Sequence, residues 1–171
     1  MGKLSAAVGA LALVGLAAGC SSTTTVIDHP SGSSSLAHVG DALGLKTASG
    51  HAFDVTVTQV VDKAHSTGST SAGKNKRFVA VLFKVNGASD QAIAGDANAD
   101  ANLVSPDGTA YFPSHDSLSE CGSHSSRYQV AAGGSTTSCV AFILRNSVKI
   151  AKVQFYPAAG SASVYGEWLV P

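Results

Sequence analysis

Charged residues are scarce in this sequence. Lys, Arg, Asp and Glu together make up 13% of the 171 residues, and eleven basic and eleven acidic side chains give a formal net charge of zero. The basic residues are spread along the chain without a run or stripe, so the sequence offers no electrostatic footprint for nucleic acid. We therefore expect no nucleic-acid partner.

The sequence also lacks the motifs that carry common chemistries. It contains no Gly-x-Ser-x-Gly elbow, phosphate loop or dinucleotide fingerprint. We therefore expect no cofactor. Ser71 and Lys74 match the Ser-x-x-Lys pattern of penicillin-recognising enzymes, but that chemistry needs a helix start and a Lys-Thr-Gly strand. Ser71 lies in a Ser/Gly segment, and Lys46-Thr47-Ala48 lacks the glycine. We attribute the match to chance and do not expect an enzyme.

Only one long apolar run is present, at the N-terminus. Residues 4–18 are almost all small and apolar, follow Lys3, and are too few to span a bilayer, which takes about 20 apolar residues. The run ends in Leu16-Ala17-Ala18-Gly19-Cys20, which resembles a bacterial lipobox, with Ala17 where the motif prefers Leu. The resemblance implies that residues 1–19 are a cleaved signal peptide. Cys20 would then carry a diacylglycerol thioether and an acyl chain such as palmitate, placing the protein on the extracytoplasmic face of the cell membrane. The alternative is an ordinary secretory signal with a chance cysteine.

The chain has three cysteines, an odd number for an oxidising compartment. If Cys20 carries lipid, Cys121 and Cys139 remain as a pair that an exported protein can keep oxidised. Closing a loop of this length stabilises a fold by about 3 kcal/mol in the chain-entropy model. We predict a Cys121–Cys139 disulfide.

Residues 20–37 are rich in Ser and Thr and have no hydrophobic periodicity, which is typical of a flexible tether. As a random coil the tether would span roughly 20–25 Å. Its Ser and Thr clusters are also candidates for O-glycosylation. The remaining residues, 38–171, are the usual size of one domain.

Hydrophobicity in this domain alternates with a period of two, which predicts strands. Abundant Gly, Ala, Ser and Thr also favour an exported β protein over a helical bundle. The nearly continuous apolar run at 77–85 is expected of a central strand covered on both faces or beside a neighbour. The expected strands are 53–58, 77–85, 97–103, 109–112, 138–144, 151–156 and 168–170. About seven short strands and no helix beyond the signal predict an all-β, antiparallel sandwich.

The order of short motifs adds a resemblance to a known family. The motifs are Val39-Gly40-Asp41, Arg77-Phe78-Val79-Ala80-Val81, Asp107-Gly108-Thr109-Ala110-Tyr111, Gly133-Gly134 before Val140-Ala141-Phe142, and Val153-Gln154-Phe155. Together they resemble an uncharacterised family of bacterial lipoprotein domains whose sandwich is similar to that of the mycobacterial immunoprotective extracellular protein. The resemblance covers roughly residues 38–171 and implies an immunoglobulin-like β-sandwich. It supplies no catalytic residues, and the cysteine pair and residues 114–128 depart from the family pattern.

Two polar patterns are candidates for metal sites. Oxygen-bearing side chains alternate in the first of them, at Asp96, Asn98, Asp100 and Asn102, with Asp107 further on, which resembles a calcium loop. However, the position that needs Gly holds Ala101, and the last ligand is Asp instead of Glu. The alternating alanines favour the wet face of a strand.

The second candidate pattern is the densest cluster of metal-capable groups. His115, Glu120 and His124 could bind zinc or copper if their loop folded back on itself. The alternative is a polar surface loop pinned by its disulfide. A metal or small-ligand site in 115–124 is therefore the second functional hypothesis.

The first hypothesis is a non-catalytic module that binds an envelope protein or polymer. Loops or an exposed sheet edge would make the contact, since strand addition is an available mode. Tyr128 and Tyr165 fall in predicted loops and are the candidate anchors, because Tyr is enriched at interface hot spots.

Overall fold

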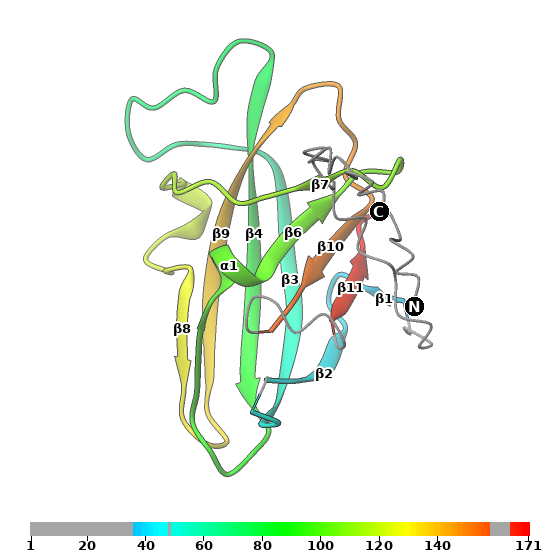
Figure 1. The fold of residues 1–171 in the computed structure, drawn as a ribbon. Coiled ribbons are helices and arrows are strands. Elements are labelled where there is room, and N and C mark those ends of the chain that lie inside the picture. Colours follow the sequence, from blue (N-terminus) through cyan, green and yellow to red (C-terminus); the bar gives the residue numbers. More distant parts are fainter. Residues whose placement is uncertain (1–35, 48, 158–164) are drawn as a thin grey trace, which may run out of the picture. The chain divides into compact units, whose positions relative to one another are not determined.

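The computed structural model describes residues 36–47, 49–157 and 165–171 (Figure 1). The predicted signal peptide, Cys20 and nearly all of the predicted tether lie outside the described residues. No helix in the described ranges is long and apolar enough to cross a membrane. The strands are β1 (Ala37–His38), β2 (Ala42–Lys46), β3 (Ala52–Ala64), β4 (Lys76–Gly87), β5 (Ile93–Asp96), β6 (Ala101–Val104), β7 (Ala110–Tyr111), β8 (Arg127–Val130), β9 (Ser135–Arg145), β10 (Lys152–Phe155) and β11 (Gly166–Leu169). A one-turn helix α1 (Ala97–Asp100) and a 3₁₀ turn η1 (Ser119–Cys121) complete the elements.

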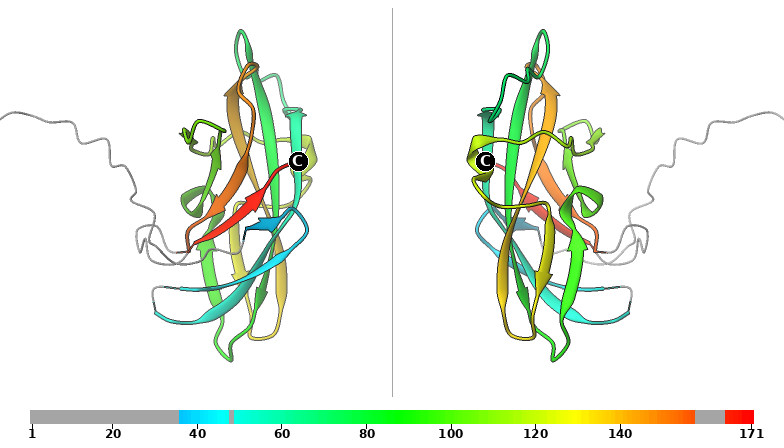
Figure 2. Two further views of the ribbon diagram at one scale, coloured as in Figure 1. Left: turned by 90° about the vertical axis from the view of Figure 1, so that its right-hand side faces the viewer. Right: turned by 90° about the vertical axis from the view of Figure 1, so that its left-hand side faces the viewer.

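The strands form two main sheets and a short ribbon, so the predicted β-sandwich is confirmed (Figure 2). One sheet has the order β2-β3-β4-β9 and is antiparallel throughout. The other has the order β1-β11-β10-β6-β7. Strands β5 and β8 pair with each other and form the short ribbon. The pairing is antiparallel as predicted except at one place, where the two-residue strand β1 runs parallel to β11.

Alternate residues of the strands build the main core. The largest fully buried side chains are Trp168, Phe53, Phe83, Phe142 and Phe155. The rings of Phe83 in β4 and Phe155 in β10 lie 5.2 Å apart, so they join the two sheets directly. Burying side chains of this size is the main favourable contribution to the stability of such a domain.

Part of the outer face of the four-stranded sheet is covered as well. Phe78, Ala80, Cys139 and Ala141 on this face form a second apolar cluster with Leu118 and Cys121 from the 114–126 segment. Strand β4 is therefore buried on both faces from Arg77 to Val81, which accounts for the continuous apolar run predicted there.

The predicted strand at 97–103 is wrong over its first half. The Asp96 carboxylate accepts a hydrogen bond from the Asn98 backbone N–H (3.0 Å) and caps α1, and β6 begins only at Ala101. Ala97 and Ala101 are both buried in the core. Residues four apart share one face of a helix, so the alternating alanines fit a helical turn as well as a strand. Residues 97–100 form a helical turn and not a strand because the Asp96 side chain caps its N-terminus.

Candidate functional site

A polar cleft of about 350 Å³ lies between the 114–126 segment, α1 and the outer side of β9. Its polar wall includes Asn98, Ser114, His115, Asp116 and His124. Leu118, Cys121, Cys139 and Ala141, which belong to the second apolar cluster, also line it. The cleft is therefore a polar hollow backed by a rigid, close-packed sheet.

Backbone hydrogen bonds fix the 114–126 segment to the free side of β9. The N–H of Ser114 donates to the Ala141 carbonyl (2.7 Å), and the N–H of Cys139 donates to the Ser125 carbonyl (3.1 Å). These bonds occupy the β9 edge, which is therefore not open for strand addition at these residues.

The predicted disulfide fixes the same segment covalently. Cys121 in η1 and Cys139 in β9 are joined, with their Cα atoms 5.4 Å apart, so the predicted pairing is confirmed. Both residues are buried.

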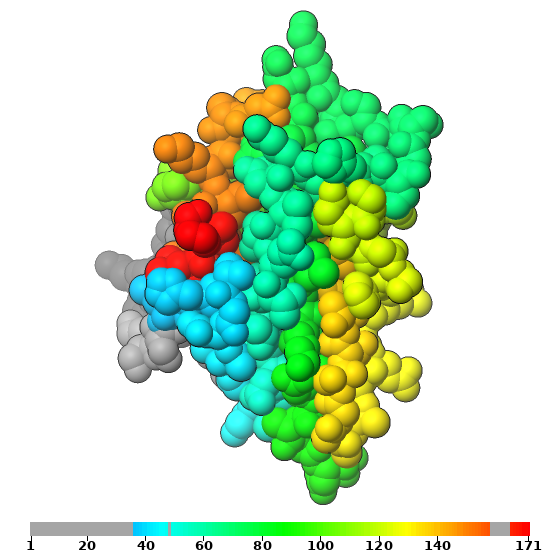
Figure 3. Space-filling model, turned by 180° about the vertical axis from the view of Figure 1, so that it is seen from behind, coloured from blue at the N-terminus to red at the C-terminus, as the bar shows by residue number. Residues whose placement is uncertain are grey.

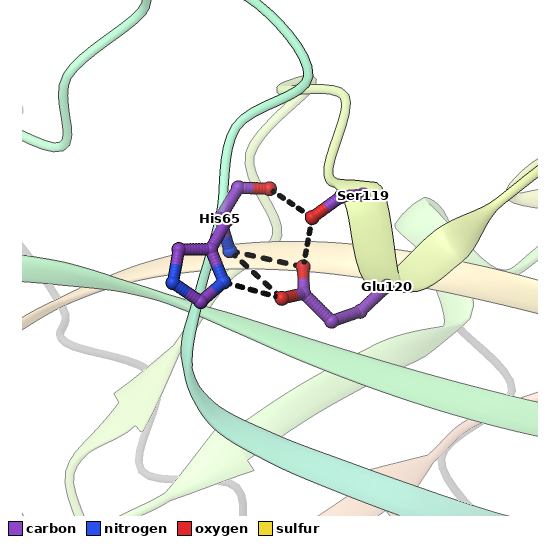
Figure 4. A network of polar contacts seen from close by, with 3 residues as sticks. All are labelled: His65, Ser119 and Glu120. Carbon is purple, nitrogen blue, oxygen red and sulfur yellow. Dashed lines mark hydrogen bonds and ion pairs between the residues drawn. The ribbon is translucent and has the colours of Figure 1, made fainter.

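Glu120 ties the segment to the end of β3 (Figure 4). Its two carboxylate oxygens accept hydrogen bonds from the His65 backbone N–H at 3.1 and 2.9 Å, and one lies 2.7 Å from His65 Nδ1. The Ser119 hydroxyl donates to the other oxygen (3.0 Å). Partial burial raises the pKa of Glu120, but the hydrogen bonds together outweigh it and lower the pKa to about 2.

We expect the contribution of Glu120 to stability to depend on pH. Since the pKa falls from 4.5 to about 2 on folding, the stabilisation is complete above about pH 4.5 and is lost as the pH drops through about 2. Glu120→Gln should lower the free energy of unfolding by about 1–2 kcal/mol at neutral pH, a modest figure because the group is partly exposed. Urea unfolding at a series of pH values should show this difference shrinking toward pH 2. Asp90→Asn, at an exposed turn, is the control, and an equal loss there would contradict the assignment.

The predicted metal ligands do not converge. Glu120 is engaged by His65 and lies outside the lining of the polar cleft, and His115 Nδ1 lies 3.4 Å from Asn98 Nδ2. The described residues contain no group of three or more His, Cys, Asp or Glu side chains that could hold a metal ion. The interpretation of His115, Glu120 and His124 as one metal site is therefore wrong.

The side chains of the predicted calcium pattern do not converge either. The Asp96 carboxylate caps α1, and the Asp100 carboxylate accepts a hydrogen bond from the Tyr128 hydroxyl (2.8 Å). Asp107 accepts from the Thr109 N–H (3.0 Å) within its own turn. Each carboxylate has a local structural partner, and the backbone turns at α1 instead of curling around an ion.

Tyr128 is not a surface anchor, contrary to the prediction. It lies in β8, is 5% exposed, and its hydroxyl is bonded to the buried Asp100 carboxylate. Burial raises the pKa of Tyr128 far above its ordinary value. Tyr165 is partly buried with its ring stacked on that of Tyr156, 4.9 Å away. A binding role for Tyr165 stays a prediction.

Two wall atoms of the polar cleft have no hydrogen-bond partner. Asn98 Oδ1 and Ser114 Oγ are shielded from solvent yet unpaired, and a third such atom, Ser138 Oγ, lies in β9 outside the lining of the cleft. A buried polar atom without a partner costs about 1–3 kcal/mol. Sequence reasoning missed this pair, because nothing in the sequence shows that residues 98 and 114 meet in one wall.

Comparison with known proteins establishes the fold. No family model and no curated protein matches the sequence. Among solved structures, the secreted protein MPT63 of Mycobacterium tuberculosis superposes with a TM-score of 0.59 at 15% identity, covering 80% of this chain and 98% of its own. The yjhA protein of Bacillus subtilis gives 0.58 at 10% identity, covering 80% of this chain and all of its own.

A third neighbour is ycdA, a candidate lipoprotein of Bacillus subtilis. It superposes with a TM-score of 0.55 at 13% identity, covering 78% of this chain but 39% of its own length. The chain shares the fold of these bacterial β-sandwiches. The predicted resemblance to the sandwich of a mycobacterial extracellular protein is therefore confirmed at the level of the fold.

Proposed function

We propose that the chain is an exported, lipid-anchored, non-catalytic binding domain whose polar cleft takes a small polar group of a cell-envelope ligand. The observation that carries the proposal is the pair of unpaired wall atoms, Asn98 Oδ1 and Ser114 Oγ. Native proteins pair nearly all of their buried polar groups, so two unpaired atoms in one wall favour a ligand that pairs with them once a rotation of the Asn98 or Ser114 side chain turns the atom toward the cleft.

The chemistry of the wall narrows the class of ligand. Asn98 Oδ1 accepts hydrogen bonds only, and a serine hydroxyl both donates and accepts, so the ligand should carry N–H or O–H donors. A cleft of about 350 Å³ lies at the small end of ligand sites. Sugars and short amides have the required donors and size.

The fixed geometry of the cleft supports binding over a surface loop of no function. The disulfide, the two backbone bonds to β9 and the Glu120–His65 contact hold the 114–126 segment at four places. A site whose wall is held before the ligand arrives loses less conformational entropy on binding.

Two features support a non-catalytic role. Among the described side chains, no hydrogen bond joins a serine hydroxyl to His115 or His124, so no nucleophile–base pair is formed in the cleft. Ser71 lies in the loop between β3 and β4, where its hydroxyl accepts a hydrogen bond from the Gly73 N–H (3.1 Å). A helix start, which the Ser-x-x-Lys chemistry needs, is absent at Ser71.

Export and anchoring are supported by the lipobox-like end of the leading apolar run at Cys20 and by the disulfide, which an oxidising compartment maintains. Two of the fold neighbours are a secreted protein and a candidate lipoprotein.

The test uses the unpaired atoms directly. Ser114→Ala and Ser138→Ala should each raise the thermal midpoint of the free protein by about 2–4 °C, because each removes a buried unpaired hydroxyl. N-Acetylglucosamine and a dipeptide amide are suitable probes, since both carry hydroxyl or amide donors.

Probe binding should raise the midpoint of the wild type and of Ser138→Ala, but not that of Ser114→Ala. Destabilisation by Ser114→Ala together with unchanged probe binding would contradict the proposal.

A further inference from the structure

The fold gathers basic residues that the sequence scatters. Strand β3 ends, β4 begins and β9 ends at the same end of the four-stranded sheet (Figures 1 and 3). Six of the eleven Lys and Arg residues lie there: Lys63, Lys74, Lys76, Arg77, Arg145 and Lys149. We call this set the basic end. The even spread of positive charge in the sequence is therefore not preserved in the fold.

Strand register and hydrogen bonds hold the basic end together. Lys76 and Arg145 are direct cross-strand partners in β4 and β9. The N–H of Asn146 donates to the Asn75 carbonyl (2.9 Å), which joins the two loops at this end. The Arg77 guanidinium donates to the Asp62 carboxylate and to the carbonyls of Arg145 and Val148.

Five of the six cations lack an anionic partner. Arg77 is buried against Asp62, which is the one carboxylate in residues 60–77 and 144–150. The other five are exposed, and none lies within 4.0 Å of a carboxylate in the part of the chain that the structure describes. The adjoining turn contributes Asp107, which is bonded to Ser105 and Thr109. Like charges directly opposite each other, as at Lys76 and Arg145, destabilise a sheet unless an external anion binds.

An amphipathic groove of about 610 Å³ opens at the basic end. Lys63 and Lys149 line it together with the side chains of Val60, Val148 and Ile150. Apolar surface between cations suits an anion that carries an apolar part, and acidic phospholipids have this combination. A polyanion such as nucleic acid or polyphosphate would leave the apolar surface uncovered.

The chain enters the domain beside this groove. Val39 lines the groove, and β1 begins two residues earlier, at Ala37. If Cys20 is lipidated and the intervening residues behave as a random coil, their root-mean-square span sets a typical distance of roughly 20–25 Å between the domain and the bilayer. With a tether of that span, the effective concentration of the basic end at the bilayer surface is in the millimolar range. Even a weak contact between the basic end and the bilayer would then be populated.

We propose that the basic end is a docking surface for an acidic phospholipid membrane, with the cations on the headgroup phosphates and the groove admitting the apolar part of a lipid. This inference rests on the proposed export and anchoring. It adds an orientation to the anchored domain, because one end of the four-stranded sheet would face the bilayer.

The test uses the mature chain from residue 20 with Cys20→Ser, so that no acyl chain contributes. Sedimentation with vesicles of phosphatidylcholine containing about 30% phosphatidylglycerol should show binding, each Lys or Arg near an anionic surface adding to the affinity. Pure phosphatidylcholine vesicles should bind at least about tenfold less, and about 1 M salt should abolish the difference because the Debye length falls to about 3 Å.

Charge reversals locate the surface. Lys76→Glu/Lys149→Glu should weaken binding at least about tenfold, whereas Lys46→Glu/Lys84→Glu, with the same change in net charge on exposed residues elsewhere, should not. The neutral variant Lys76→Gln/Lys149→Gln controls for a folding defect in the charge reversal. It should also weaken vesicle binding, and its thermal midpoint should equal that of the wild type. Equal loss in both reversals, or binding to soluble polyphosphate without binding to vesicles, would overturn the proposal.

The outcome is separable from the proposed function. The vesicle assay involves neither the lipid on Cys20 nor the polar cleft, so its failure leaves both in place. Detergent partitioning of the native protein against a Cys20→Ser chain tests the anchor, and failure there leaves the vesicle result standing.

Discussion

Replacing Cys121 and Cys139 together with alanine should lower the free energy of unfolding by about 3 kcal/mol. The two cysteines are 18 residues apart in sequence, and the bridge restricts the unfolded chain by closing that loop. Both side chains are also buried among Phe78, Leu118 and Ala141, so their packing is lost as well. The 114–126 segment would then depend on its hydrogen bonds and on the packing of Leu118, and the polar cleft should bind probes more weakly.

Guanidinium unfolding of the oxidised wild type and the double alanine variant measures this difference. The reduced wild type is the control, and it should lose nearly as much stability as the variant, since reduction removes the same covalent link. A loss below about 1 kcal/mol in both would mean that the segment is held without help from the bridge.

Gly95→Ala should lower the free energy of unfolding by about 2–3 kcal/mol, a large effect for one methyl group. Gly95 in β5 lies directly opposite Tyr128 in β8. A Cβ atom on Gly95 would meet the Tyr128 hydroxyl oxygen and Cζ closer than carbon atoms can approach. The ring would have to move, and the hydrogen bond from Tyr128 to the buried Asp100 carboxylate would be broken.

A double-mutant cycle isolates this cause. In a Tyr128→Ala background the ring is absent, so Gly95→Ala should cost little, and the coupling should account for most of the single-mutant effect. Gly44→Ala in β2 is the matched control, because its Cβ would meet only the Asp54 carboxylate at an ordinary 3.5 Å. If Gly95→Ala lowered the free energy of unfolding equally with and without the Tyr128 ring, the loss would come from the backbone conformation at residue 95 and not from a clash with the ring.

The parts of the fold that depend on local pattern could be predicted from the sequence. Alternation and apolar runs indicated seven of the eleven described strands and missed β1, β2, β5 and β8. The unbroken run at 77–85 indicated a strand covered on both faces. The disulfide followed from counting cysteines in a chain with a predicted export signal. Each of these inferences needs only neighbouring residues or a residue count.

The features that carry the proposals depend on contacts between distant segments. Tyr128 was expected in a loop because nothing in the sequence shows that residues 127–130 pair with 93–96 and bury the ring. Asn98 and Ser114 become one wall only when the 114–126 segment is fixed against β9. Lys76 and Arg145 become neighbours through strand register, 69 positions apart in the chain.

The central claim is that the polar cleft is a binding site completed by a donor-bearing ligand. The most direct measurement is the ¹H–¹⁵N correlation spectrum of the labelled mature chain, titrated with N-acetylglucosamine and with a dipeptide amide. We expect at least one probe to shift the signals of the Asn98 side-chain amide and of the Ser114 and His115 backbone. Ser114→Ala should remove these shifts, and Ser138→Ala should keep them. Signals of the cleft that stay fixed with both probes, or shifts confined to the opposite side of the sandwich, would contradict it.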